Sequence, residues 1–275
     1  MLGIIDCHTH IGLRAFLAEP IPPEKLKRPA FQDPLENSVE NLIAQMEVNG
    51  VEKAVVFGYP LKEIDRVRAN TYVLAAHQRY PNRIIPFMLV GDDTEYWLER
   101  GARGFKQQDI LYAPQRFDLK RAYRIMAAAG VPMLIHFRAG PGYSVPAQVT
   151  AILEDAPELK LIIAHMGRHT PNTGERVEEA LCALQTVPNV LFETSTVRDP
   201  AVIARAVEIV GPQRIVFGSD YPFNSHINED PLAEEITVIE RAGLPDRVKQ
   251  AILRENILHF LDLHIPGPAR ERDMT

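Results

Sequence analysis

The strongest constraint in this sequence is a repeated alternation of short apolar runs with longer amphipathic stretches. Eight apolar runs recur, each about five to eight residues long and rich in Ile, Val, Leu and Phe. Short runs of this kind are typical of parallel strands that are buried on both faces. The predicted strands are Ile4–His10, Lys53–Tyr59, Arg83–Val90, Ala102–Gln107, Pro132–Phe137, Leu159–His165, Asn189–Thr196 and Arg214–Asp220.

The stretches between these runs have helical spacing. Asp-Pro pairs at 199–200 and 230–231 fit an N-cap followed by a first-turn proline. Glycine follows four of the stretches, where a left-handed residue often ends a helix, at positions 50, 130, 211 and 243. The predicted helices are Leu35–Asn49, Asp118–Ala129, Pro146–Ala156, Glu175–Gln185, Pro200–Val210 and Leu232–Arg241, with an additional helix at Asp246–Leu261.

This alternation predicts a (β/α)8 TIM barrel. The length of 275 residues is close to the roughly 250 usual for one such barrel. An open doubly wound sheet is the alternative, but it would normally carry a Gly-rich fingerprint after the first strand, and none is present. We expect one domain over residues 1–265 and a disordered, polar tail over 266–275. The proline-rich segment 11–34 is expected to cover part of the active-site face.

Bulk properties argue against several classes of protein. The net charge is −6 and no run of Lys or Arg suggests nucleic-acid binding. No apolar run reaches the roughly 18 residues that a membrane span needs. Cys7 and Cys182 form no CxxC pair, so neither a disulfide framework nor a thiolate metal site is indicated. The chain has no signal-like segment ahead of its first strand, and we expect a cytoplasmic protein.

Acids and imidazoles fall at the ends of the predicted strands. Because strand side chains alternate between faces, Asp6, His8 and His10 should share one face of the first strand. The carboxyl ends of all eight strands meet at one mouth of a barrel, where the active sites of such enzymes lie. Further polar residues late in the later strands should converge there: Lys106, His136, His165, Glu193 and Asp220.

Burying several imidazoles and carboxylates at one end of an apolar barrel is costly unless they are paired or bind a cation. A divalent metal would remove that cost. Neutral imidazole and carboxylate donors suit Zn²⁺ best, with Mn²⁺, Fe²⁺ or Co²⁺ as alternatives. Three histidines, one aspartate and a water would leave the exchangeable position that catalysis requires.

The motifs at these strand ends resemble those of a known superfamily. Ile5-Asp6-Cys7-His8-Thr9-His10 looks like the opening motif of the amidohydrolase superfamily. Ala164-His165-Met166-Gly167 and Phe217-Gly218-Ser219-Asp220-Tyr221-Pro222 resemble its amidohydrolase-related branch. That branch includes enzymes similar to aminocarboxymuconate semialdehyde decarboxylase, together with lactone hydrolases and hydratases. The resemblance extends from Ile4 to Leu258.

The resemblance implies a role for each of these residues. His8, His10, His136 and Asp220 would be the metal ligands, and His165 would be a catalytic imidazole. Asp220 would also assist the attacking water. In binuclear relatives a carboxylated lysine on the fourth strand bridges two metals, a place that Lys106 could fill, but this branch is usually mononuclear.

Four further residues are candidates for binding substrate. Arg138 and Arg168 follow motif histidines closely, and an Arg fork binds carboxylates through two parallel hydrogen bonds. Each could equally be a charge on the surface of a loop. Lys106 and Glu193 could contact substrate or serve as polar residues of the barrel interior. Asp6 lies one layer deeper, which favours a structural role over direct ligation.

Three functions fit these observations. The first is a metal-dependent hydrolase, in which a metal-activated water attacks an ester, lactone or amide carbonyl of a small substrate. The second is a nonoxidative decarboxylase of an aromatic or unsaturated acid. The third is a metal-binding sensor protein without catalysis. We favour hydrolysis, because the chain is compact and decarboxylases of this branch tend to carry longer insertions. Barrels that it resembles often form dimers, so a homodimer is compatible with this prediction.

Overall fold

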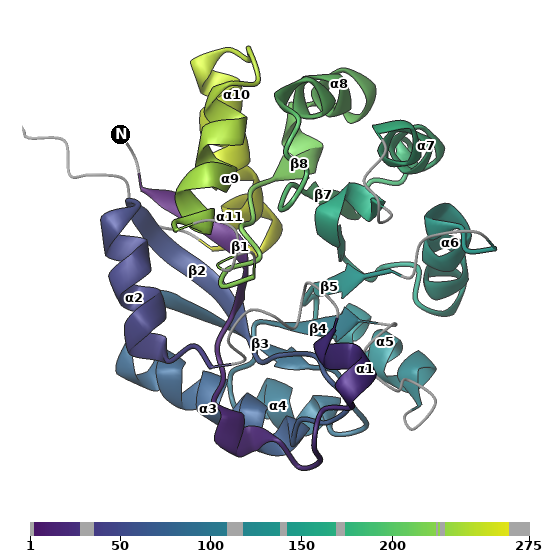
Figure 1. Cartoon of the computed structure of the whole chain (residues 1–275). Helices are drawn as coiled ribbons and strands as arrows, with labels where there is room; N and C mark the ends of the chain where they lie inside the picture. The colour runs from purple at the N-terminus through teal and green to yellow at the C-terminus, as the bar shows by residue number, and fades with distance from the viewer. Residues whose placement is uncertain are drawn as a thin grey trace, which may run out of the picture.

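The computed structural model has eight parallel strands in the order β1 to β8, each paired with the next. The barrel is closed by β1 and the segment after β8. The Cys7 amide donates to the Phe217 carbonyl (3.0 Å), and the His10 amide donates to the Tyr221 carbonyl (2.8 Å). Figure 1 shows the strands at the centre with the helices around them. The predicted (β/α)8 barrel is therefore confirmed.

The structure describes residues 3–27, 36–108, 118–137, 142–168, 174–223, 225 and 229–263. The predicted tail at 266–275 lies outside the described residues. The strands are β1 (Ile4–His10), β2 (Val51–Phe57), β3 (Ile84–Leu89), β4 (Gly104–Gln108), β5 (Met133–His136), β6 (Leu161–Ile163), β7 (Val190–Glu193) and β8 (Ile215–Val216).

The helices lie between the strands and continue after β8. They are α1 (Pro23–Leu26), α2 (Val39–Val48), α3 (Arg66–Arg79), α4 (Thr94–Glu99), α5 (Leu119–Ala128), α6 (Val145–Asp155), α7 (Gly174–Leu184), α8 (Pro200–Val210), α9 (Pro231–Glu240), α10 (Asp246–Gln250) and α11 (Asn256–Phe260). Among the described residues, no helix is long and apolar enough to cross a membrane.

Local sequence rules explain how several helices begin and end. The Asp199 carboxylate accepts from the Ala201 amide (2.9 Å) at the start of α8, and Asp230 accepts from the Ala233 amide (3.0 Å) at the start of α9. The predicted glycines all have positive φ, which glycine adopts without a steric cost. They are Gly50 (67°), Gly130 (66°), Gly211 (84°) and Gly243 (68°).

Besides the four-residue α1, two helices were not predicted from the sequence. In α3 the mean hydropathy is low and the apolar stripe is weak, so its helical periodicity is hard to recognise. The other, α4, has only six residues, which is too short to establish a period. The predicted C-terminal helix is confirmed, but it contains a π-helical turn at Ala251–Glu255 between α10 and α11.

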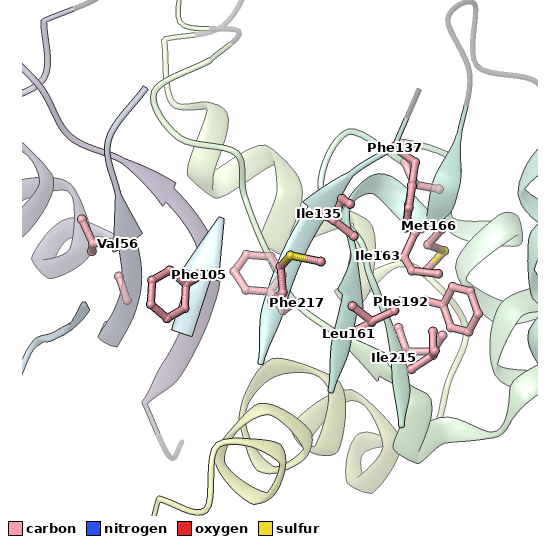
Figure 2. Packing of buried hydrophobic residues seen from close by; sticks show 14 of the residues in the cluster. Val56, Phe105, Ile135, Phe137, Leu161, Ile163, Met166, Phe192, Ile215 and Phe217 are labelled. Atoms are coloured by element: carbon pink, nitrogen blue, oxygen red, sulfur yellow. The ribbon is translucent and has the colours of Figure 1, made fainter. Parts of the chain in front are cut away.

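The apolar core is divided by the sheet into two layers. The outer layer lies between the strands and the surrounding helices and includes Phe105, Ile135 and Phe192 (Figure 2). The inner layer fills the barrel with Ile5, Val55, Phe87, Leu134, Ile162, Leu191 and Val216. Ile257 of α11 packs on this inner layer. Below the strand ends, the described part of the barrel interior is thus filled by apolar side chains.

Strict alternation along β1 proved wrong for Cys7. Alternation would turn Cys7, which lies between Asp6 and His8, toward the helices, but Cys7 packs with the inner cluster that contains Ile5 and Val55. The reason is a register irregularity, since Asp6 pairs with Ala54 while Thr9 pairs with Val56. A bulge of this kind re-aims side chains near active sites.

Candidate metal centre

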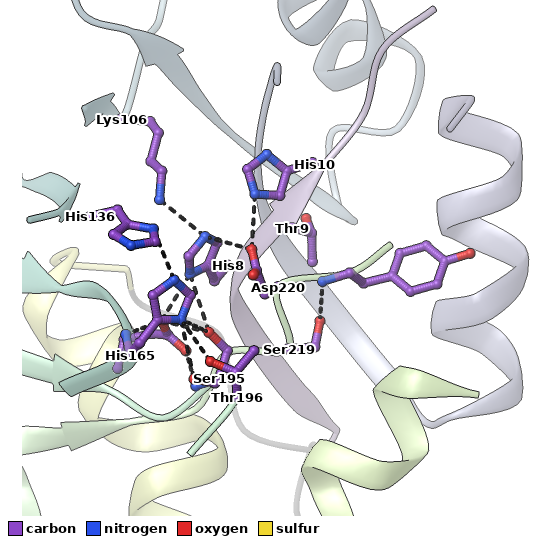
Figure 3. A network of polar contacts seen from close by, with 12 residues as sticks. His8, Thr9, His10, Lys106, His136, His165, Ser195, Thr196, Ser219 and Asp220 are labelled. Carbon is purple, nitrogen blue, oxygen red and sulfur yellow. Dashed lines mark hydrogen bonds and ion pairs between the residues drawn. The ribbon is translucent and has the colours of Figure 1, made fainter. Parts of the chain in front are cut away.

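The two histidines of β1 are each held through the same ring nitrogen. His8 Nδ1 lies 2.8 Å from Glu193 Oε2, and His10 Nδ1 lies 3.3 Å from the Gly58 carbonyl oxygen. Because both partners are acceptors, Nδ1 carries the proton in each ring, and Nε2 keeps its lone pair. Both Nε2 atoms lie 3.1 Å from Asp220 Oδ1 (Figure 3).

Asp220 is positioned by an unusual backbone conformation after β8. Its φ is 59°, and its amide donates to the His8 carbonyl (2.8 Å). Burial acts to raise the pKa of its carboxyl. The neighbouring His8 and His10 rings and the ammonium group of Lys106 outweigh burial and hold the pKa below its ordinary value. Asp220 is thus an ionised carboxylate facing two imidazole nitrogens.

Two further imidazoles complete the cluster. His165 Nε2 lies 3.1 Å from His136 Nδ1, and His165 Nδ1 lies 2.8 Å from Ser195 Oγ. His165 has a φ of 55°, so it leaves β6 in a left-handed turn and not as the last residue of a strand. Burial lowers the pKa of all four imidazoles, that of His136 to about 3, which keeps them neutral.

Glu193 connects the cluster from beneath. Its Oε2 accepts from His8 Nδ1, from the His165 amide (3.0 Å) and from Ser195 Oγ (2.9 Å), and its Oε1 accepts from the Ser195 amide. The residue is completely buried. These contacts favour the interior role of Glu193 over contact with substrate.

Gly218 is required by close packing beneath the site. A Cβ at this position would overlap Glu193 Oε1 and would lie 2.8 Å from His8 Cβ. Asp6 lies nearby, where it accepts from the His8 amide (3.0 Å), the Ser219 amide (3.1 Å) and Ser219 Oγ (2.5 Å). Burial raises the pKa of Asp6 to about 7 despite these bonds. Asp6 thus ties β1 to the segment after β8, in line with the structural role predicted for it.

Lys106 projects from β4 into the same cluster. Its Nζ lies 3.0 Å from His8 Nε2, and its side chain is 1 % exposed. Burial lowers the pKa of the amine to about 8, against the opposing charges of Asp220 and Glu193. Lys106 is therefore a cationic group at the centre of the site, beside the carboxylate of Asp220.

The donor set fits a divalent ion. Neutral imidazoles whose second nitrogen is bonded to a carboxylate or a backbone carbonyl are characteristic of metal ligands. His8, His165 and Asp220 can each offer one ligand atom, and these three atoms lie within 4.8 Å of one another. His165 can therefore offer a ligand atom, in addition to the predicted ligands His10 and His136.

Of the two arginines predicted as candidates for binding substrate, the structure describes one. Arg138 lies outside the described residues. Arg168 is half-buried, and its Nε donates to Thr196 Oγ1 (2.6 Å). Burial lowers the pKa of Arg168, while Asp220, Glu235 and Glu193 act in the opposite direction.

Sequence reasoning missed several residues of this site. Ser195 and Thr196 lie two and three positions after Glu193, so their hydroxyl groups close to the predicted strand end were the available signal. Glu235 is a charged residue on the apolar stripe of α9, three positions after Leu232. The sequence shows this placement, but it does not show that Glu235 accepts a hydrogen bond from the Thr196 amide.

Comparison with known proteins identifies the family of this chain. Residues 5–263 match the family model described as Amidohydrolase. The chain is 32% identical to a 2-amino-3-carboxymuconate-6-semialdehyde decarboxylase of Caenorhabditis elegans, over 39% of this chain but only 29% of that protein's length.

Solved structures share the fold. A candidate 2-pyrone-4,6-dicarboxylic acid hydrolase from Pseudomonas putida superposes with a TM-score of 0.73 at 17% identity, covering 97% of this chain and 100% of that one. A dihydroxybenzoic acid decarboxylase from Polaromonas, which contains bound manganese, has a TM-score of 0.67 at 15% identity and covers 95% and 97%. With the family model matched over nearly its whole length, the chain belongs to the amidohydrolase family.

Proposed function

We propose that this protein is a metal-dependent hydrolase acting on an ester, lactone or amide carbonyl of a small carboxylate-bearing substrate. The observation that carries the proposal is the shared direction of two imidazole nitrogens: His8 Nε2 and His10 Nε2 both face Asp220 Oδ1 at 3.1 Å. His8, His10, His136 and Asp220 would hold one divalent ion. Such an ion supplies Lewis-acid activation of a water molecule and of the substrate carbonyl.

The chain's own residues supply the remaining chemistry. Asp220 is held ionised, so it can accept a proton from the attacking water. His165 is neutral and fixed by Ser195, which suits it to orient the reacting carbonyl. Arg168 has a planar fork that matches a carboxylate, and Lys106 adds a second cationic group.

A lactone that bears carboxylates is the first substrate class to test. The candidate hydrolase from Pseudomonas putida is named for 2-pyrone-4,6-dicarboxylic acid. A pyrone ring contains an ester carbonyl open to attack by water, and its carboxylates would match the guanidinium of Arg168.

The decarboxylase alternative is supported by the local identity of 32% to the nematode decarboxylase. In that function the ion and Arg168 would hold the acid, and Lys106 or Asp220 would transfer a proton to the carbon that loses carbon dioxide.

The identity of the ion is a separate proposal. The imidazole and carboxylate donors suit Zn²⁺. Mn²⁺ is the alternative, because the Polaromonas decarboxylase contains manganese. Metal analysis of the protein purified without added metal distinguishes the two.

One pair of assays separates the candidate functions. The protein is loaded with Zn²⁺ or Mn²⁺ and supplied with 2-pyrone-4,6-dicarboxylate or with 2,6-dihydroxybenzoate. Ring opening with consumption of base supports the hydrolase, and carbon dioxide release supports the decarboxylase. Tight metal binding with no turnover across a wider panel of lactones, amides and aromatic acids would contradict both.

Three broader proposals remain. Residues 1–265 would form one domain followed by a short tail at 266–275. The two cysteines form no disulfide, which is compatible with the cytoplasm. A homodimer is the proposed assembly, and light scattering of the purified protein tests it.

A further inference from the structure

Glu235 occupies an unexpected place on α9. It lies on the buried side of the helix with Leu232, Ile236 and Ile239, and it is only 3 % exposed. A buried carboxylate is costly unless it is paired or hydrogen-bonded. An apolar side chain would complete this stripe without that cost, so the carboxylate calls for a specific reason.

The hydrogen bonding of Glu235 is one-sided. Its Oε2 accepts from the Thr196 amide (3.0 Å), whereas its buried Oε1 has no hydrogen-bond partner among the described residues. Burial raises the pKa of Glu235 well above its ordinary value, and the bond from Thr196 only partly opposes this. The contact with Thr196, 39 residues away, is therefore the structural reason for this carboxylate.

Thr196 holds a conformation that needs support. Its φ is 60°, in the left-handed region that a β-branched residue rarely adopts. Glu235 binds its amide on one side, and Arg168 Nε donates to its hydroxyl (2.6 Å) on the other. Thr196 Oγ1 also lies 3.3 Å from His165 Nδ1 (Figure 3). This residue therefore links α9 to the candidate metal centre.

Arg168 has part of its guanidinium available for a ligand. Thr196 takes its Nε, and no carboxylate of the described residues lies within ion-pairing distance of its guanidinium nitrogens. Nη1 and Nη2 can then receive a carboxylate through two parallel hydrogen bonds. Recognition of this kind depends on the plane of the fork, which the Thr196 hydroxyl fixes.

We propose that Glu235 is a positioning residue for Arg168, acting through Thr196. Glu235 holds the amide of Thr196 in its left-handed turn, and the Thr196 hydroxyl then orients the guanidinium toward the substrate carboxylate. The proposal rests on the proposed function, in which the substrate carries a carboxylate. Glu235 itself touches no reacting atom.

Crystal structures of three variants test the chain of contacts directly. Glu235→Gln keeps an acceptor for the Thr196 amide, Glu235→Leu removes it, and Thr196→Val removes only the hydroxyl. We expect the Arg168–Thr196 hydrogen bond to persist in Glu235→Gln and to be lost in Glu235→Leu. A folded Glu235→Leu protein that retains this bond, with Thr196 still left-handed, would overturn the proposal.

Binding measurements test the consequence. The probes are 2,6-dihydroxybenzoate and resorcinol, which differ only by the carboxylate, and the measured quantity is the ratio of their affinities. We expect this ratio to fall at least about tenfold in Glu235→Leu and Thr196→Val and to be retained in Glu235→Gln. If Glu235→Leu does not fold, an unchanged ratio in Thr196→Val overturns the proposal.

Arg168→Met separates this proposal from the proposed function. A ratio lowered by Arg168→Met but not by Glu235→Leu or Thr196→Val contradicts the positioning role alone. Equal affinity of the wild-type protein for both probes, or no effect of Arg168→Met, contradicts carboxylate recognition by Arg168 and so the proposed function. The crystal structures report on Glu235 in either case.

Discussion

At the scale of single residues, the centre depends on which imidazole nitrogen faces inward. In His8 and His10 an acceptor holds Nδ1, so Nε2 points toward Asp220. His136 and His165 contact each other through Nδ1 and Nε2. Variants of each residue show which of the two is the proposed metal ligand and which is the proposed catalytic imidazole.

Metal analysis of four alanine variants makes this distinction. We expect about one equivalent of metal in the wild-type protein, loss of metal in His8→Ala, Asp220→Ala and His136→Ala, and retention of metal with loss of turnover in His165→Ala. Loss of metal from His165→Ala together with retention in His136→Ala would exchange the two roles. About two equivalents in wild type would indicate a binuclear site bridged by a carboxylated Lys106.

Gly218→Ala tests the packing beneath the ligands. The added methyl group would displace Glu193 or His8, because a Cβ has no room between them. We expect metal affinity to fall about 10- to 100-fold, as when an outer hydrogen-bond partner is removed. Gly50→Ala is the control. Its φ is 67° with nothing within 4 Å of the new Cβ, so it should lower stability by about 1 kcal/mol and leave metal affinity unchanged.

At the scale of elements, α9 is an amphipathic helix with one carboxylate on its buried side. The pKa of Glu235 is raised in the folded protein, so the folded state holds its proton to a higher pH than the unfolded state does. Above the unfolded pKa, near 4.5, the cost of ionising the buried group reduces stability as pH rises toward the folded pKa. Above the folded pKa, the loss of stability no longer changes with pH.

Glu235→Gln replaces the titrating carboxyl with an amide. The pH dependence that Glu235 causes should therefore appear as a difference in Tm between the variant and the wild-type protein. We expect the variant and the wild-type protein to differ least in Tm near pH 4.5, and the variant to gain relative stability as pH increases from 5 to 8. Thermal unfolding of both proteins at matched metal loading measures the difference at each pH. A difference independent of pH would show that Glu235 does not titrate with a raised pKa.

At the scale of the whole molecule, the barrel has two unlike ends. The mouth holds the ionisable cluster, and the inner apolar layer below it extends to α11. Ile257 is fully buried against this layer. α11 therefore closes the barrel at a distance from the chemistry, and its contribution should appear in stability and not in metal binding.

Ile257→Ala tests this separation. Removing the buried side chain should cost about 2–5 kcal/mol of unfolding free energy, measured by denaturant unfolding. Metal content and the affinity for 2,6-dihydroxybenzoate should stay unchanged. A variant with full stability would mean that α11 does not stabilise the barrel. A variant that loses metal would show that packing at α11 affects the metal centre.

The sequence by itself determined the barrel and the position of most of the site. Alternation of apolar runs with helical stretches is a local property, and so are the Asp caps and the glycines that end helices. Strand ends must meet at one mouth in a parallel barrel, so the sequence alone places Lys106, His136, Glu193 and Asp220 there. The opening His-x-His motif, together with the later motifs at His165 and Asp220, identified the family, which the match over residues 5–263 confirms.

Only the tertiary structure decided how these groups face one another. The bulge in β1 turned Cys7 inward, and the left-handed turn at His165 brought its ring within ligand distance of His8 and Asp220. The partnership of Glu235 with Thr196 joins residues 39 positions apart on different elements. Periodicity assigns a residue to a face, but hydrogen bonds between distant segments set its direction, and those form only when the chain has packed.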